Sequence, residues 1–231
     1  MLKVCLDTSA FTVNAALYRD GLLLGQEQAD ASTSVSLAVP RILEALLAPL
    51  GKTVRDIGQW DLGIGPGSFT GTRVGIAFAK GVALISGARL RGVNSGFGFL
   101  PAALRQTPTL THLAVIHDGR RDEVILNLLE LQDGSWRVAA PAEVIKTLDL
   151  PRFVSNDAGF HFATTLPAVH FAAMSPELVA KILFVHGPEA AGLEFDPQAA
   201  LAADALGLEA ALEPIYVRPA VFVAPIVSRN I

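Results

Sequence analysis

The chain has 231 residues, a formal net charge of −4 and a mean hydropathy of +0.44, with 51% hydrophobic and 17% charged residues. This composition excludes a disordered chain, and the negative charge argues against nucleic-acid binding through the overall field of the protein. No apolar run approaches the ~20 residues that cross a membrane, and the N-terminus lacks the uninterrupted apolar stretch of a signal peptide. With only one cysteine, Cys5, we expect a cytoplasmic protein of one large or two small domains.

The N-terminal segment predicts a three-stranded antiparallel meander. Strands are expected at residues 2–6, 12–18 and 22–26. Asp20-Gly21 suits the hairpin turn, because both residues tolerate positive φ. A helix is expected over 39–50, where apolar residues recur at helical spacing, Pro40 suits the first turn and Gly51 suits the end.

A strand, a glycine-rich loop, a helix and another strand follow. The strands are expected at 59–64 and 89–93, and the helix at 70–86. This helix is apolar nearly all round and has small residues between its large ones. Such a helix must be covered on most sides, by the rest of the chain or by another subunit.

The strand pattern of the first segment returns in the second half. Strands are expected at 113–117, 122–131 and 135–139, with Asp118 at the first corner and Asp133-Gly134 at the hairpin. Beyond them we expect helices over 141–147, 176–185 and 198–208 and a strand over 153–155. The repeated order predicts two duplicated α/β domains, residues 1–105 and 106–231.

Two segments carry groups that suit anions. The loop that begins at Gly65 precedes a helix, whose free N–H groups attract phosphate or carboxylate, although it lacks the lysine of a Walker A loop. In the second segment, Asp7 is followed by the hydroxyl residues Thr8 and Ser9, and such a turn can hold a hydrated metal or bind phosphate. The structural alternatives are a capped turn and an Asx turn. The candidate anion-site residues are Asp7, Thr8, Ser9, Gly65, Gly67, Ser68, Thr70 and Gly71.

No metal site and no catalytic residue is predicted. Neither HExxH nor HxxxH occurs, and His112 and His117 flank a strand, where we expect surface or turn positions. Cys5 lies among apolar residues and is expected to be a buried, inert thiol. Arg120-Arg121 forms a turn, either as a solvated tip or as a contact to RNA phosphate.

Four motifs, in order, resemble the TsaB/YeaZ family. They are DTS at 7–9, GPGSFTGTRVG at 65–75, DGRRDEV at 118–124 and PIYVRP at 214–219. The second motif is the most specific, and the four span most of the chain. The resemblance implies two duplicated actin/Hsp70/sugar-kinase-like (ribonuclease H-like) α/β domains with mixed five-stranded sheets and flanking helices. It allows the C-terminal segment to pack back on the first domain.

The resemblance also implies a function. Family members are non-catalytic subunits of the bacterial machinery that makes threonylcarbamoyladenosine in tRNA. They form a heterodimer with a larger homologous catalytic subunit, a small ATPase subunit joins them, and they reach tRNA indirectly. The isolated chain could also pair with a second copy of itself. ATP or ADP could bind at a subunit interface, and no other cofactor is expected. The implied partner surface is formed by Ile42, Leu46, Arg73, Val74, Ala77, Phe78 and Gly81.

Two departures from related proteins limit the chemistry that we expect. Ser34 falls where many family members keep a histidine, and residues 155–159 are all that remains of a kinase-type glycine-rich nucleotide loop. Metal chemistry, a glycoprotease activity and ATP binding by the chain alone are therefore not expected. The alternative function is a free-standing ATP-dependent small-molecule kinase of the same fold, which needs a catalytic carboxylate and an intact adenosine loop.

Overall fold

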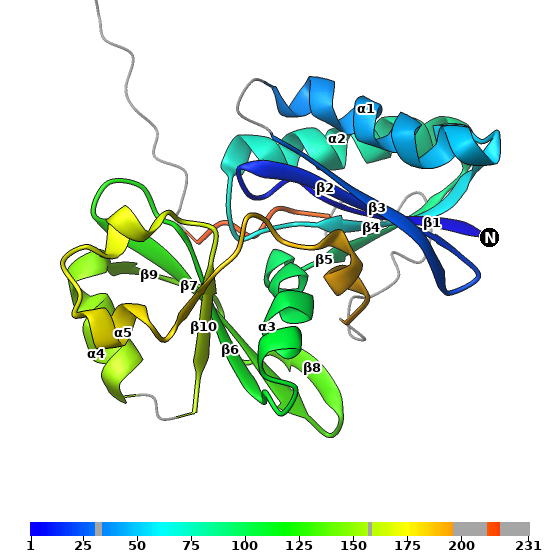
Figure 1. Cartoon of the computed structure of the whole chain (residues 1–231). Coiled ribbons are helices and arrows are strands. Elements are labelled where there is room, and N and C mark those ends of the chain that lie inside the picture. Colours follow the sequence, from blue (N-terminus) through cyan, green and yellow to red (C-terminus); the bar gives the residue numbers. More distant parts are fainter. Residues whose placement is uncertain (31–33, 157–158, 196–211, 218–231) are drawn as a thin grey trace, which may run out of the picture.

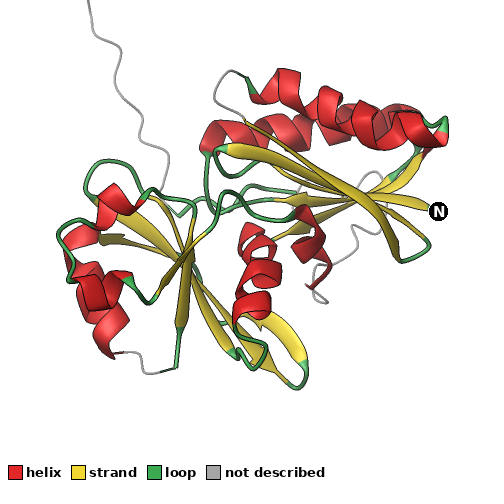
Figure 2. Cartoon of the chain, viewed as in Figure 1, coloured by secondary structure: helices red, strands yellow, loops and turns green. Residues whose placement is uncertain are grey.

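The computed structural model describes residues 1–30, 34–156, 159–195 and 212–217. Two β-sheets, each with helices packed on it, make up this part of the chain (Figure 1, Figure 2). Within the described ranges, none of the helices combines the length and the apolar composition needed to cross a bilayer.

The first sheet begins with the predicted antiparallel meander and continues with two parallel strands. Its strands are β1 (Leu2–Asp7), β2 (Thr12–Arg19), β3 (Leu22–Asp30), β4 (Ile57–Gly63) and β5 (Arg89–Val93), in the order β3-β2-β1-β4-β5. Asp20 and Gly21 have φ values of 51° and 85°, which confirms the hairpin turn. Strand β3 runs beyond the expected residue 26, because its pairing with β2 continues to Asp30.

The second sheet repeats this topology. Its strands β6 (His112–Asp118), β7 (Glu123–Gln132) and β8 (Ser135–Val138) form the meander, and β10 (His161–Thr164) and β11 (Ile182–Phe184) are the parallel strands, in the order β8-β7-β6-β10-β11. Order and strand directions match the first sheet, so the predicted duplication is confirmed. The expected five strands are wrong here, since β9 (Glu143–Lys146) pairs with β7 as a sixth.

Helices cover the outer faces of both sheets and fill the space between them. On the first sheet lie α1 (Val35–Leu47), continued by η1 (Ala48–Leu50), and α2 (Phe69–Ser86) (Figure 1). Between the sheets lie η3 (Ser95–Phe99), α3 (Leu100–Gln106) and η6 (Ala190–Phe195). The second sheet carries η4 (Thr147–Asp149), α4 (Leu150–Asn156), η5 (Ala168–Phe171) and α5 (Pro176–Val179), and η2 (Val54–Asp56) precedes β4.

Three hydrophobic cores follow from this layering. Trp60 lies in the core under α1 and α2, and Phe171 in the core outside the second sheet. The middle core, around Phe97, takes side chains from both sheets and so joins the two halves. Buried Asn94 and Asn127 add a reciprocal pair of amide hydrogen bonds, 3.2 and 2.6 Å long, between the halves.

Several expectations for the second half are wrong. The helix expected over 141–147 is absent, and residues 143–146 of this range form strand β9 instead, because β7 offers them a free edge. The expected strand at 153–155 belongs to α4, whose Pro151 suits a first helical turn. The expected helix at 176–185 ends at Val179, and the chain then pairs with β10 as β11. The expected helix at 198–208 lies outside the described residues, and the division at residue 105 stays a prediction.

Candidate functional site

The glycine-rich loop packs directly on the acid-hydroxyl turn. The Ser68 N–H donates to the Ser9 carbonyl at 2.6 Å, and the Thr8 hydroxyl donates to the Gly71 carbonyl at 2.8 Å. Gly67 has a φ of +151°, and a Cβ at this position would overlap the Ser9 carbonyl. The two motifs, which begin at residues 7 and 65, therefore form one structural unit.

The glycines of this loop serve close packing within the chain. A Cβ at Gly71 would overlap the Thr8 carbonyl, and a Cβ at Gly75 would overlap the Thr8 hydroxyl. The capped-turn alternative is present, because Ser68 caps α2 and accepts from the Gly71 N–H at 3.2 Å. In the first turn of α2, the amides of Phe69 and Thr70 have no partner among the described residues. Anion binding at this loop stays a prediction.

Asp7 is a buried turn residue. Its Oδ1 accepts from the Ser9 N–H at 2.9 Å and from the Ser9 hydroxyl at 2.7 Å, which is the Asx-turn alternative. Its Oδ2 has no hydrogen-bond partner in the described part of the chain. Burial raises the pKa of Asp7, while the nearby Ser95 hydroxyl and the Ser9 N–H and hydroxyl lower it by a smaller amount. A carboxyl enclosed in this way does not face solvent, where a hydrated metal would approach.

The second acidic corner has the same place in its sheet but a different environment. Asp118 is exposed, and its Oδ1 accepts from the Arg120 N–H at 2.7 Å. Arg120 and Arg121, both exposed, have φ values of 70° and 55°. Because Asp7 is buried and Asp118 is exposed, the two corners do not form one open acidic site.

A C-terminal segment, residues 214–217, crosses the end of the glycine-rich loop. We call this segment the strap. The Ile215 N–H donates to the Ile64 carbonyl at 2.7 Å, directly before the loop begins. The Tyr216 hydroxyl accepts from Arg73 Nε at 2.8 Å. The strap therefore joins the fourth sequence motif to the second, and the C-terminal segment packs back on the first half.

Arg73 packs against a pair of aromatic rings. Its guanidinium carbon lies 3.7 Å from the centroid of Phe69 and 5.4 Å from that of Tyr216, and the two rings are 5.3 Å apart. Periodicity and spacing place Arg73 on α2 but give no signal for its contact with a residue 143 positions away.

The outward face of α2 is apolar and largely bare. Its exposed residues recur at helical spacing: Arg73, Ala77, Gly81, Leu84 and Ile85. Leu84 and Ile85 keep 83% and 71% of their surface accessible. The predicted interface residues Val74 and Phe78 are half-buried. We call this surface, with Val74 and Phe78 at its border, the α2 face.

The predicted contribution of α1 needs correction. Ile42 is only 5% exposed, because the apolar stripe of α1 packs on the first sheet. Leu46 is half-buried and lies against Gly25 of β3. The residues that α1 presents to solvent include Leu37, Arg41 and Glu44.

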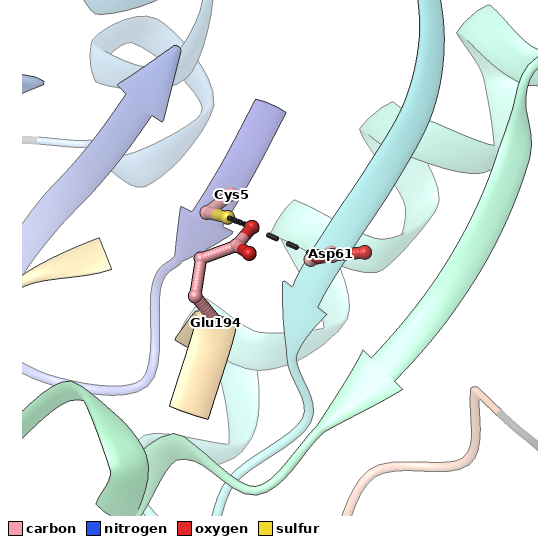
Figure 3. Close-up of side chains that lie close together, drawn as sticks. All are labelled: Cys5, Asp61 and Glu194. Atoms are coloured by element: carbon pink, nitrogen blue, oxygen red, sulfur yellow. Dashed lines mark hydrogen bonds between the residues drawn. The ribbon is translucent and has the colours of Figure 1, made fainter. Parts of the chain in front are cut away.

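Cys5, Asp61 and Glu194 gather where η6 meets the first sheet (Figure 3). Lys3 forms ion pairs with both carboxylates, and Arg91 donates two hydrogen bonds to Asp61, at 2.9 and 2.6 Å. Two cations thus already balance two carboxylates, so the cluster offers a metal ion no uncompensated charge. Cys5 is fully buried, as expected. Burial, then the charges of Asp61 and Glu194, raises the pKa of its thiol.

His117 is buried, contrary to the expected surface position. Side chains alternate along β6, so His117 points with Leu113 and Val115 toward the middle core and meets Phe99 edge-on at 5.6 Å. Its Nε2 has no partner among the described residues. Burial lowers the pKa of His117 to about 4, so the ring is neutral at pH 7.

A depression of about 360 Å³ lies between the two sheets, beside the strap. It is lined mainly by apolar or backbone groups, with Asn94 and Tyr216 as its polar side chains. Among the described residues, neither a carboxylate nor a cationic side chain lines it. The described lining of the depression therefore offers no group that would bind a polyphosphate or abstract a proton.

Known proteins resemble the chain in sequence and in fold. A family model described as TsaD, tRNA N6-adenosine threonylcarbamoyltransferase, matches residues 29–183. The tRNA threonylcarbamoyladenosine biosynthesis protein TsaB of Escherichia coli is 31% identical over 63% of this chain and 63% of its own length, so the match spans less than two thirds of that relative. The TsaB protein of Bacillus subtilis is 26% identical over 70% of this chain and 73% of its own length.

A solved structure extends the likeness to the fold. The crystal structure of an uncharacterized protein with similarity to peptidase YeaZ from Pseudomonas aeruginosa has a TM-score of 0.71 and 25% identity, covering 94% of this chain and 99% of that one. The family model covers well over half of the chain, and the sequence and structure matches agree with each other. The chain therefore belongs to the family that the TsaD model describes and, within it, to the TsaB/YeaZ proteins.

Proposed function

We propose that the chain is a non-catalytic subunit of the machinery that makes threonylcarbamoyladenosine in tRNA, and that it pairs with a homologous catalytic threonylcarbamoyltransferase. The observation that carries this proposal is the bare α2 face, with Leu84 and Ile85 exposed on a helix whose other side is core. A contiguous exposed apolar surface is typical of a protein-protein contact. The names of the TsaB relatives supply the pathway.

The proposal includes the finer assignments of the family. The interface comprises Arg73, Val74, Ala77, Phe78 and Gly81, with Leu46 at its border. A small ATPase subunit joins the pair, tRNA is reached indirectly, and the complex works in the cytoplasm. The amides of Phe69 and Thr70, which lack a partner in the described part of the chain, support an anion site at the loop. The two halves divide near residue 105.

Several features favour a chain that is inactive alone. Asp7 is enclosed, and the depression between the sheets has no carboxylate among its described lining residues. The competing function, a free-standing small-molecule kinase, requires such a carboxylate at its substrate site. Incubating the purified chain with ATP and a panel of sugars and acids tests this alternative, and robust turnover without a partner would contradict the subunit proposal.

Co-expression with the candidate catalytic homologue, followed by affinity capture, tests the pairing. We expect a stable complex, and we expect Ala77→Glu to abolish it because the substitution places a charge within the apolar α2 face. Ala173→Glu is the matched control, since Ala173 is exposed on the second half. Capture that is unaffected by Ala77→Glu would remove the α2 face from the interface.

A further inference from the structure

Arg73 is a rigid cation at one end of the apolar α2 face. Its guanidinium stacks on Phe69, and Tyr216 accepts from its Nε. Phe69 and Tyr216 keep 43% and 46% of their own surface exposed, so the cluster itself faces outward. In the described part of the chain, no carboxylate pairs with this guanidinium.

The stacking leaves a specific pair of donors free. Nε donates to Tyr216, while neither terminal nitrogen has an acceptor within the described residues. A planar guanidinium that is fixed in this way loses little side-chain entropy on binding, and its free edge fits a carboxylate with two parallel hydrogen bonds. Stacked arginines surrounded by apolar surface are frequent energetic anchors of interfaces.

The charge on this side of the molecule contrasts with the chain as a whole. The sequence of α2 contains Arg73 and Lys80 but neither Asp nor Glu, and α1 presents Arg41 and Glu44. The net charge of the entire chain is −4. Because both charged residues of α2 are positive, the α2 helices of two copies would bring like charges together if they faced each other. A partner helix with an acidic residue opposite Arg73 therefore suits this surface better than the α2 helix of a second copy does.

We propose that Arg73 is the charged anchor of the α2 face, that it pairs with a carboxylate on the catalytic subunit, and that Tyr216 of the strap is its positioning residue. This inference rests on the proposed function. It extends the partner surface from the two N-terminal helices to the C-terminal strap, which lies 143 residues further along the chain.

Titration calorimetry with the purified catalytic homologue tests the anchor. We expect Arg73→Ala to weaken binding about 10- to 100-fold, as for a central arginine anchor. Arg73→Lys should recover only a small part of the lost affinity, because the lysine ammonium lacks the planar pair of donors that a guanidinium offers to a carboxylate. Tyr216→Phe keeps the ring but loses the hydrogen bond, and we expect a loss of about 3- to 10-fold. Arg121→Ala, an exposed arginine on the second half, should bind like the unmodified chain.

Different failures have different meanings. If the unmodified chain does not bind the homologue, the proposed function fails. If it binds, and Arg73→Ala and Arg73→Glu bind within about twofold of it, the anchor is overturned while the proposed function stands. An Arg73→Ala effect that is unchanged between low and about 0.5 M salt would also overturn the charge pairing. Equal binding by Tyr216→Phe would remove the positioning role. Thermal melting of each variant checks that the fold is intact.

Discussion

The Thr8 hydroxyl occupies the space that a side chain at position 75 would need. Thr8 belongs to the turn after β1, and Gly75 lies in the second turn of α2. Their contact, together with the hydrogen bond from Thr8 to the Gly71 carbonyl, holds the start of α2 against the sheet. The glycines of the most specific motif in the sequence thus position the helix that carries the proposed partner surface.

Gly75→Ala should destabilise the protein by about 1–3 kcal/mol, because its methyl group overpacks against Thr8. Gly81→Ala on the same helix is the matched control, since a Cβ there meets nothing within 4 Å. It should stabilise by about 0.5–1 kcal/mol through helix propensity. Urea denaturation measures both, and equal effects of the two substitutions would contradict the packing account.

Lys3→Met should destabilise by about 2–4 kcal/mol, because Asp61 and Glu194 would face each other without the ammonium that separates their charges. Lys52→Met is the control. It breaks an exposed ion pair with Asp56, and such a pair contributes less than about 1 kcal/mol. A loss for Lys3→Met no larger than that of the control would show that the cluster is not a stabilising network.

His117 should make stability depend on pH. Its pKa is about 4 in the folded chain and near its ordinary 6.5 when unfolded, so between these values the unfolded state binds the extra proton. The free energy of unfolding should therefore fall as the pH drops from 6.5 toward 4, by up to about 3 kcal/mol from this residue. Phenylalanine does not titrate, so the stability of His117→Phe relative to the unmodified chain should rise when the pH is lowered from 7.5 to 5. A difference that is constant with pH would contradict neutral burial.

Asp7 should contribute to stability with a pH dependence opposite to that of His117, and Asp7→Asn should remove this contribution. Burial raises the folded pKa of Asp7, so the folded state holds its proton more tightly, and stability from this residue is lost as the pH rises through that pKa. Asparagine can still accept from Ser9 through Oδ1 but carries no buried charge. We expect the variant to gain about 1 kcal/mol or more relative to the unmodified chain at pH 8, and less at pH 4. A larger advantage at pH 4 would show that the carboxylate is stabilised by its surroundings.

Local patterns predicted much of this fold. Asp20-Gly21 and Asp133-Gly134 both form turns with positive φ, and the turn before α2 is capped, which is one of the alternatives. These signals depend on neighbouring residues only. The duplication also follows from local order, since each meander repeats the same sequence of strands and corners.

Contacts between distant segments account for the errors. Residues 143–146 form a strand because β7 lies beside them. Val144 and Ile145 suit a strand, but so short a segment does not by itself predict one. Ile42 fits a partner surface by residue type but faces its own sheet. The clamp between Arg73 and Tyr216 depends on where the C-terminal strap crosses the loop, so no spacing in the sequence could reveal it.

The most direct test of the account is reconstituted modification of tRNA. The catalytic homologue and the small ATPase subunit are incubated with ATP, an activated threonylcarbamoyl donor and tRNA, with and without this chain. Threonylcarbamoyladenosine is then quantified by mass spectrometry. We predict that the product forms only when the chain is present, and that Ala77→Glu prevents it while Ala173→Glu does not. Equal product without the chain, or product from the chain in the absence of the catalytic homologue, would contradict its role as a non-catalytic partner subunit.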